Sequence, residues 1–149
     1  MKISHFARLT GLLLVAGLFY SCSSTGLNIQ DLRTQGNYEQ ALSEIKDRLS
    51  ENPSQPSLYI QQAEINALLA QNEEPESRSE FYRQTVESLN EGTRYEASER
   101  QLSTIDSLKQ QLWKFEHNAG LRVSDNEMAT DRYDRAKTHF QNALIIRPD

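Results

Sequence analysis

The residues that could take part in catalysis or bind a metal ion are few, and their spacing does not group them. The chain has three histidines and one cysteine, Cys22. A single cysteine cannot form an internal disulfide or a cysteine-based metal site. His117 and His139 stand apart from each other without the spacing of a helical zinc motif, and His5 lies close to the N-terminus. We therefore predict no catalytic residues and no metal site from these side chains.

Carboxylates are more abundant, and they cluster at Glu73–Glu76 and Glu96–Glu99. A pair of carboxylates can perform acid–base catalysis, but clusters of this kind are more typical of a solvated loop or helix face. The sequence also has no GxSxG nucleophile motif, no P-loop and no GxGxxG loop. We expect no enzymatic activity, no cofactor and no small-molecule substrate.

The charge of the chain limits the class of partner. The 149 residues carry a net charge of −5. Lys2 and Arg8 are the charged residues that precede the first acidic residue, Asp31, so removing residues 1–21 would change the net charge from −5 to −7. An acidic body of this kind argues against nucleic acid as a partner.

The N-terminal segment has the layout of an export signal. Lys2 and Arg8 form a positive region, and Leu9–Tyr20 is an apolar run of 12 residues that ends just before Ser21-Cys22. This run is too short to span a bilayer, which takes about 20 apolar residues. The segment resembles a bacterial lipoprotein signal, in which the peptide is cut before a cysteine that carries acyl chains. Ordinary secretion with cleavage near Ser23, or a buried N-terminal helix, are the alternatives.

The resemblance to a lipoprotein signal implies three parts of the chain and a location. Residues 1–21 would be the signal peptide, residues 22–27 the lipidated Cys22 and a short tether, and residues 28–149 the folded domain. Acyl chains on Cys22 would anchor the protein to a membrane of the bacterial envelope. Ser23 and Ser24 after the cysteine favour the outer membrane, with the domain facing the periplasm.

The rest of the chain has the apolar spacing of helices separated by short turns. Leu42, Ile45 and Leu49 recur at helical spacing, and Gly36-Asn37 and the Pro53–Pro56 region interrupt the pattern. No segment alternates apolar and polar residues as a strand does. The predicted helices cover about residues 28–35, 38–51, 56–71, 76–91, 95–122 and 130–147.

Two segments repeat one pattern. Residues 35–53 and 132–148 align on Tyr38 and Tyr133, and Ala143 adds a second small residue to the later copy. The shared positions are Ala41 and Ala136, Ile45 and Phe140, Leu49 and Leu144, and Pro53 and Pro148. This pattern resembles the second helix of a tetratricopeptide repeat (TPR), in which small residues allow close helix packing and proline ends the helix.

The TPR resemblance implies an all-α, TPR-like solenoid of antiparallel helix pairs, with about two and a half to three degenerate repeats over residues 28–149. Repeat arrays usually end in a polar capping helix. The sequence stops at Pro148-Asp149 without one, so we expect the domain to be truncated at its C-terminus. The alternative is that a partner covers the apolar face of the last helix, at Phe140, Leu144 and Ile145.

The TPR family binds protein partners on a concave face formed by first helices. In this chain the resemblance places six residues there: Ile60, Glu64, Leu68, Lys114, His117 and Leu121. The predicted function is a non-catalytic, lipid-anchored adaptor that binds a protein partner in the envelope. The alternative is that the helices form the N-terminal spacer of a larger envelope enzyme or glycan-capture lipoprotein.

Overall fold

The computed structural model describes residues 28–126 and 130–148. This part of the chain is all-helical and contains no strand, which confirms the predicted all-α class. The predicted signal peptide, Cys22 and the tether lie outside the described residues. The helices are α1 (Ile29–Thr34), α2 (Tyr38–Glu51), α3 (Pro56–Asn72), the short 3₁₀ helix η1 (Pro75–Ser77), α4 (Arg78–Thr93), α5 (Glu99–Ser124) and α6 (Arg132–Ile146).

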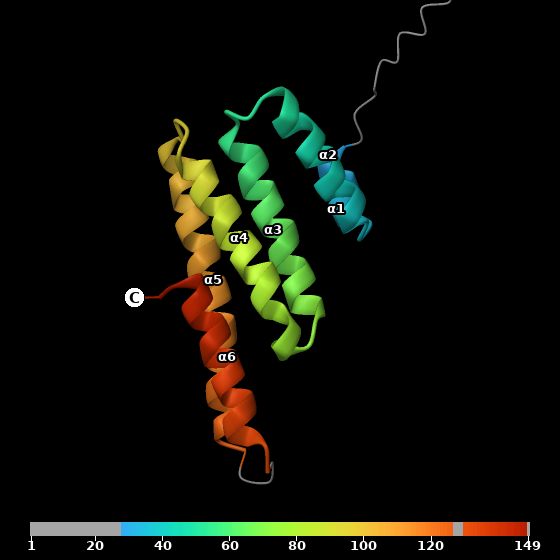
Figure 1. Ribbon diagram of the computed structural model, residues 1–149. Helices are drawn as coiled ribbons and strands as arrows, with labels where there is room; N and C mark the ends of the chain where they lie inside the picture. Colours follow the sequence, from blue (N-terminus) through green and yellow to red (C-terminus); the bar gives the residue numbers. More distant parts are fainter. Residues whose placement is uncertain (1–27, 127–129, 149) are drawn as a thin grey trace, which may run out of the picture.

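Helices that are consecutive in the sequence pack against each other as helical hairpins (Figure 1). The largest interfaces join α3 to α4 and α5 to α6, and α1 packs against α2. Smaller interfaces join α2 to α3, α3 to α5 and α4 to α6. The hairpin of α5 and α6 reaches beyond the end of the α3–α4 hairpin, as Figure 1 shows. No helix in the described residues is long and apolar enough to cross a membrane.

Local sequence accounts for the helix ends. Pro56 occupies the first turn of α3, where its missing N–H is tolerated. Ser98 and Gln101 form a capping box that starts α5. Gly36 has φ of 76° and donates to the carbonyl of Arg33, while the N–H of Asn37 donates to Leu32. This Schellman motif ends α1 and lets the chain turn directly into α2.

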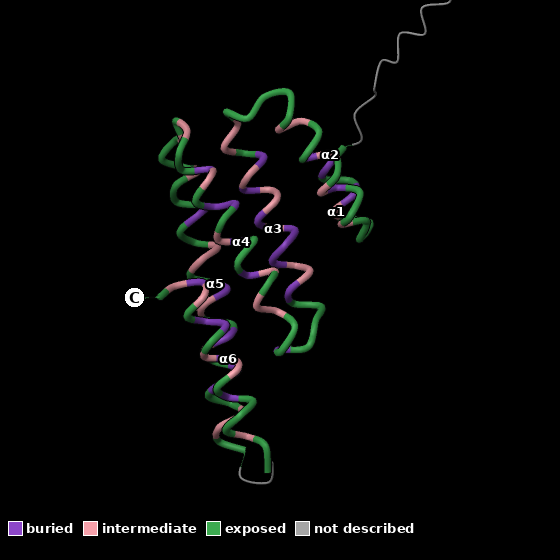
Figure 2. The backbone as a smooth tube through the Cα atoms, in the orientation of Figure 1, coloured by how far each residue is buried: buried purple, intermediate pink, exposed green. Residues whose placement is uncertain are grey.

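Buried residues recur along the helices (Figure 2), and their apolar side chains form three clusters between helices. One apolar cluster joins α1 and α2 to α3: Ile29, Leu32, Ala41, Ile45, Leu58 and Ile65. A second joins α3, α4, α5 and α6: Ala67, Ala70, Tyr82, Leu112 and Ile146. A third joins α3, α4 and α5: Ile60, Ala63, Leu89 and Ile105. The helix α3 contributes to all three clusters, so it is the central element of the array.

Most residues of the repeated pattern lie at or beside helix contacts. Ala41, Ile45, Ala136 and Ala143 are buried, Leu49 and Phe140 are half-buried, and Pro53 and Pro148 follow the ends of α2 and α6. Phe140 packs closely on Gly120. A Cβ atom added to Gly120 would lie 2.7 Å from an atom of the Phe140 ring. The small residue on α5 therefore makes room for the aromatic ring of α6.

Two residues of the pattern do not pack as predicted. Tyr133 is 68% exposed and Leu144 is 57% exposed. Tyr133 lies in the first turn of α6, where the guanidinium of Arg132 lies over its ring. Leu144 points away from the α5 contact because its neighbour Ala143 occupies the buried side of α6.

Candidate functional site

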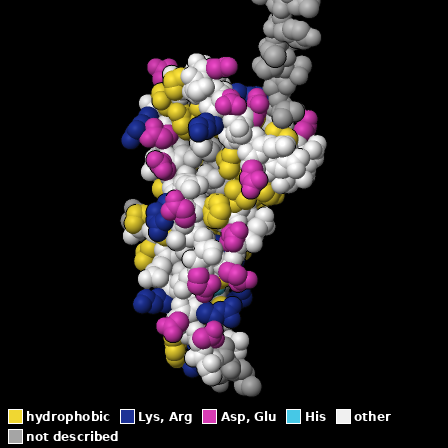
Figure 3. Space-filling model, turned by 45° about the vertical axis from the view of Figure 1, so that its right-hand side comes forward, with side chains coloured by type: hydrophobic (Ala, Val, Ile, Leu, Met, Phe, Trp, Pro, Cys, Tyr) yellow, Lys and Arg dark blue, Asp and Glu magenta, His cyan; other side chains and the backbone are white. Residues whose placement is uncertain are grey.

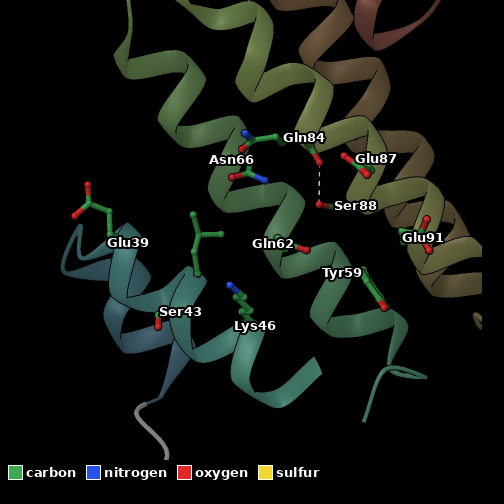
Figure 4. Close-up of a pocket in the computed structure, with 11 residues that line it drawn as sticks. Glu39, Ser43, Lys46, Tyr59, Gln62, Asn66, Gln84, Glu87, Ser88 and Glu91 are labelled. Atoms are coloured by element: carbon green, nitrogen blue, oxygen red, sulfur yellow. Dashed lines mark hydrogen bonds between the residues drawn. The ribbon is translucent and has the colours of Figure 1, made fainter. Parts of the chain in front are cut away.

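A groove of about 580 Å³ lies where α2, α3 and α4 meet (Figure 4). The central helix α3 lies between α2 and α4, and each of the three contributes one stripe of side chains at helical spacing. The lining residues are Glu39, Leu42, Ser43 and Lys46 on α2, Tyr59, Gln62 and Asn66 on α3, and Gln84, Glu87, Ser88 and Glu91 on α4. Most of these side chains are polar, so the groove differs from the apolar contacts beneath it.

Three of the lining residues are largely buried or desolvated. Ser88 is 6% exposed and donates its hydroxyl hydrogen to the Gln84 carbonyl at 2.8 Å. Burial and the neighbouring Tyr95 raise the pKa of Tyr59 to about 12, so its hydroxyl is protonated at neutral pH. Asn66 is 3% exposed and has no hydrogen-bond partner in the described part of the chain.

The charged residues of the groove are mostly acidic. Glu39 and Glu87 are exposed and form no ion pair with any described residue. Glu91 pairs with Arg94 at 2.6 Å, and Lys46 is the basic residue of the lining. The space-filling view shows acidic side chains spread over the face that it presents (Figure 3). The groove thus offers hydrogen-bonding groups and an excess of carboxylates.

The α3 residues of the predicted binding face have different environments. Glu64 pairs with Arg33 of α1 and lines a smaller groove of about 350 Å³ between α3 and α5. Leu68 is half-buried. Ile60 contradicts the prediction, because it is 7% exposed and packs with Leu89 and Ile105 in the third apolar cluster. A partner cannot reach Ile60 without separating α4 and α5 from α3.

The α5 residues of the predicted face do not join the α3 residues in one groove. The groove beside Glu64 is lined on α5 by residues between Arg100 and Gln111. Lys114 and Leu121 are exposed farther along α5, where this helix pairs with α6. His117 stacks on Trp113 with ring centroids 4.6 Å apart and also contacts Phe140. His117 therefore belongs to the α5–α6 packing and not to an open surface.

A buried polar cluster that the sequence reading missed joins α4, α5 and α6. Glu116 of α5 has no exposed surface. Its Oε1 accepts hydrogen bonds from Arg78 at 3.0 Å and from the Tyr82 hydroxyl at 2.7 Å. Its Oε2 lies 2.6 Å from Nδ1 of His139. Nearby, Asn142 donates to the Pro75 carbonyl at 2.8 Å, which ties α6 to η1.

The environment of this cluster indicates a structural role. Burial and the hydrogen bond to Glu116 raise the pKa of Tyr82 well above its usual range. Because Glu116 and Tyr82 have no exposed surface, a substrate cannot reach them while α4, α5 and α6 stay packed. One sequence signal could have revealed the cluster. Glu116 lies four residues after Leu112 and three before Ala119, so it occupies the buried face of α5.

No group of acidic, histidine or cysteine side chains in the described residues could hold a metal ion. His139 contacts Glu116, and His117 stacks on Trp113. The chain matches no protein-family model, no curated protein and no solved structure in the comparisons.

Proposed function

We propose that this protein is a non-catalytic adaptor of the bacterial envelope that binds a protein partner on the surface of a TPR-like helical array. Acyl chains on Cys22 would anchor it in the outer membrane, with the helices facing the periplasm. The layout of Leu9–Tyr20 followed by Ser21-Cys22 supports the anchor.

The packing of the helices supports the TPR-like part of the proposal. Consecutive helices form hairpins, and the small residues Ala136 and Ala143 are buried on α6. Phe140 packs on Gly120 of the preceding helix. Small residues facing a large one across a helix pair are characteristic of such repeats.

One observation carries the adaptor function: the groove between α2, α3 and α4 is open, while the buried Glu116–His139 contact lies elsewhere, between α4, α5 and α6. Its lining combines amide, hydroxyl and carboxylate side chains around Leu42. Glu116 and His139, which could transfer protons, are buried between α4, α5 and α6 and contact each other there. An open polar groove without a reactive centre suits binding better than turnover.

The experiment has one arm for the anchor and one for the partner. When the full chain is expressed in a bacterium, it should incorporate radioactive palmitate and sediment with membranes, and Cys22→Ala should lose both properties. A photo-reactive benzophenone side chain replacing Ser43 in the groove should cross-link one envelope protein. The same side chain replacing exposed Lys137 on α6 should not.

Two results would overturn this function. Cys22→Ala could be labelled and sedimented as well as the unchanged protein, which would remove the anchor. Alternatively, the purified chain could hydrolyse a peptide, glycan or ester at a rate that depends on a single side chain, which would make it an enzyme.

A further inference from the structure

The groove contains a buried amide that lacks a partner. Asn66 is 3% exposed, lines the groove, and forms no hydrogen bond with any described residue. Among the described residues, every side-chain nitrogen or oxygen atom that is fully covered has a hydrogen-bond partner. Because Asn66 has no partner, its amide atoms are not fully covered, and they reach the open space of the groove. Because only this small part of the side chain is accessible, little water can bond to it, and burying a polar group without its full set of hydrogen bonds is unfavourable. A ligand that pairs with this amide would remove that cost.

The chemistry of the asparagine side chain indicates which group it would pair with. Its carboxamide carries an acceptor oxygen and two N–H donors. In an extended chain, the N–H and C=O of one residue point to the same side, as they do in the hydrogen-bonded pairs of an antiparallel sheet. The Asn66 carboxamide can therefore bond to both groups of one residue in an extended peptide.

The size of the groove suits a short segment of this kind. The lining residues of α3 run from Tyr59 to Asn66. At about 1.5 Å per residue these positions cover roughly 10 Å of the helix, which corresponds to about three residues of extended chain. Lining side chains on α2 and α4 lie on either side of this stretch, as Figure 4 shows.

The charges of the groove indicate the side chains of the segment. Glu39 and Glu87 have no ionic partner among the described residues, and Glu91 adds a third carboxylate that pairs with Arg94. Lys46 is the one basic residue in the lining. An excess of carboxylates attracts a basic ligand and repels an acidic one.

We propose that the groove between α2, α3 and α4 binds an extended, lysine- or arginine-containing segment of a partner protein. Asn66 pairs with the backbone of one residue of the segment, and Glu39 and Glu87 face its basic side chains. This assignment rests on the proposed adaptor function and specifies the chemistry of the partner.

The test measures binding of defined peptides to the full chain in a neutral detergent by fluorescence anisotropy. The probe is a short labelled peptide that alternates lysine and serine. A matched peptide alternates glutamate and serine, and a third is the lysine peptide with its central amides N-methylated. The lysine peptide should bind, and the glutamate peptide should not. Added salt should weaken binding of the lysine peptide.

Charge variants test the role of the carboxylates. The double variant Glu39→Gln and Glu87→Gln should raise the Kd of the lysine peptide about fivefold, as expected for the loss of two exposed ion pairs. The double variant Glu96→Gln and Asp106→Asn removes the same charge from exposed positions outside the groove. Its Kd should change less than about twofold.

Substitutions of Asn66 test the backbone contact. N-methylation should raise the Kd of the unchanged protein about fivefold, the size of a lost hydrogen bond. In Asn66→Leu the same N-methylation should change the Kd less than about twofold, because the side-chain carboxamide that bonds to the peptide backbone is absent. Asn66 makes no internal hydrogen bond to lose, so the variant should fold. Asn66→Ala provides a second, smaller replacement, and circular dichroism verifies both.

Equal binding of the lysine and glutamate peptides, or equal sensitivity to N-methylation in the unchanged protein and in both Asn66 variants, would overturn the assignment. The adaptor function would fail differently, through loss of the Cys22-dependent membrane association or through hydrolytic turnover. Cross-linking at Ser43 together with absent binding of the lysine peptide would contradict the basic extended segment and leave the adaptor function intact.

Discussion

The two ends of the helical array are tied to its middle by ion pairs in opposite environments. At the N-terminal end, Arg33 of α1 pairs with Glu64 of α3, and these side chains are 31% and 26% exposed. At the C-terminal end, Glu116 pairs with Arg78 and contacts Tyr82 and His139 with no exposed surface. The first pair is partly solvated, whereas the second joins three helices inside the protein.

This difference shows where the molecule is rigid and where it can adjust. A buried carboxylate with three partners fixes the relative position of α4, α5 and α6, because moving any one of them takes a hydrogen-bond partner away from a buried polar group. The first hairpin meets the rest of the array through a smaller interface of α2 with α3 and one apolar cluster. The groove lies at this less constrained junction, which suits the partner-binding surface that we propose.

Removing the buried carboxylate should have the largest effect on the stability of the protein. Glu116→Ala would leave Nη1 of Arg78 and the Tyr82 hydroxyl without their acceptor in a buried site. We expect the free energy of unfolding to fall by about 3–5 kcal/mol. Urea denaturation followed by circular dichroism measures this loss. Glu74→Ala, at an exposed position, is the control and should stay within about 0.5 kcal/mol.

A loss as small as that of the control would mean that Glu116 is solvated in the folded protein. The ion pairs at the two ends of the molecule would then both be solvated, and the two ends would not differ in this respect.

The packing of α6 on α5 gives the next largest expected effect. Ala136 is 3% exposed, so a larger side chain there must displace its neighbours. Ala136→Leu should lower stability by about 1–3 kcal/mol. Lys137→Leu places the same side chain at the adjacent exposed position and should change the melting temperature little. Equal tolerance of leucine at both positions would contradict the packing of α6.

The sequence predicted the helices well because their signals are local. The segment predicted at 38–51 coincides with α2, since apolar spacing and the turns at Gly36 and Pro53 bound it on both sides. The helix predicted at 95–122 begins later, at Glu99, because the Ser98 capping box sets its start. Tyr133 was misplaced because a repeat pattern does not reveal that α6 begins with a turn outside the helix contact.

The site was harder to predict because its contacts are distant in sequence. Glu116 lies 38 residues from Arg78 and 23 from His139, so no short motif contains all three. Ile60 was assigned to an open face from its position on a first helix, but α4 and α5 cover it. The groove at Asn66 depends on how α2 and α4 lie beside α3, and a single helix pattern does not contain that information.

The Tyr82 hydroxyl should make the stability of the C-terminal cluster depend on pH. Tyr82→Phe removes one donor to the buried Glu116 and should cost about 1–3 kcal/mol at neutral pH. Because the folded pKa of Tyr82 lies above its unfolded value of 10.0, the folded state keeps a proton that the unfolded state releases. The stabilisation by Tyr82 is therefore complete below about pH 10 and is lost as the pH rises further.

Denaturation at several pH values from neutral to about pH 11 measures this dependence in both proteins. The stability of the unchanged protein should fall more steeply above about pH 10 than that of Tyr82→Phe, so the difference between them should narrow. If the free energies of unfolding of the two proteins changed with pH in parallel, the Tyr82 hydroxyl would have the same pKa in the folded and unfolded states.

The smallest expected effect is the coupling between Arg33 and Glu64 at the N-terminal end. A double-mutant cycle of Arg33→Ala and Glu64→Ala should give a coupling free energy below about 1 kcal/mol, as is usual for partly exposed pairs. Because solvent and ions reach this pair, the coupling should shrink further at high salt. The matching cycle of Arg78→Ala and Glu116→Ala provides the reference, and its coupling should be larger and less sensitive to salt. If the Arg33–Glu64 coupling equals that reference and resists salt, the first hairpin is held as firmly as the C-terminal helices. The groove beside it would then be as rigid as the rest of the molecule.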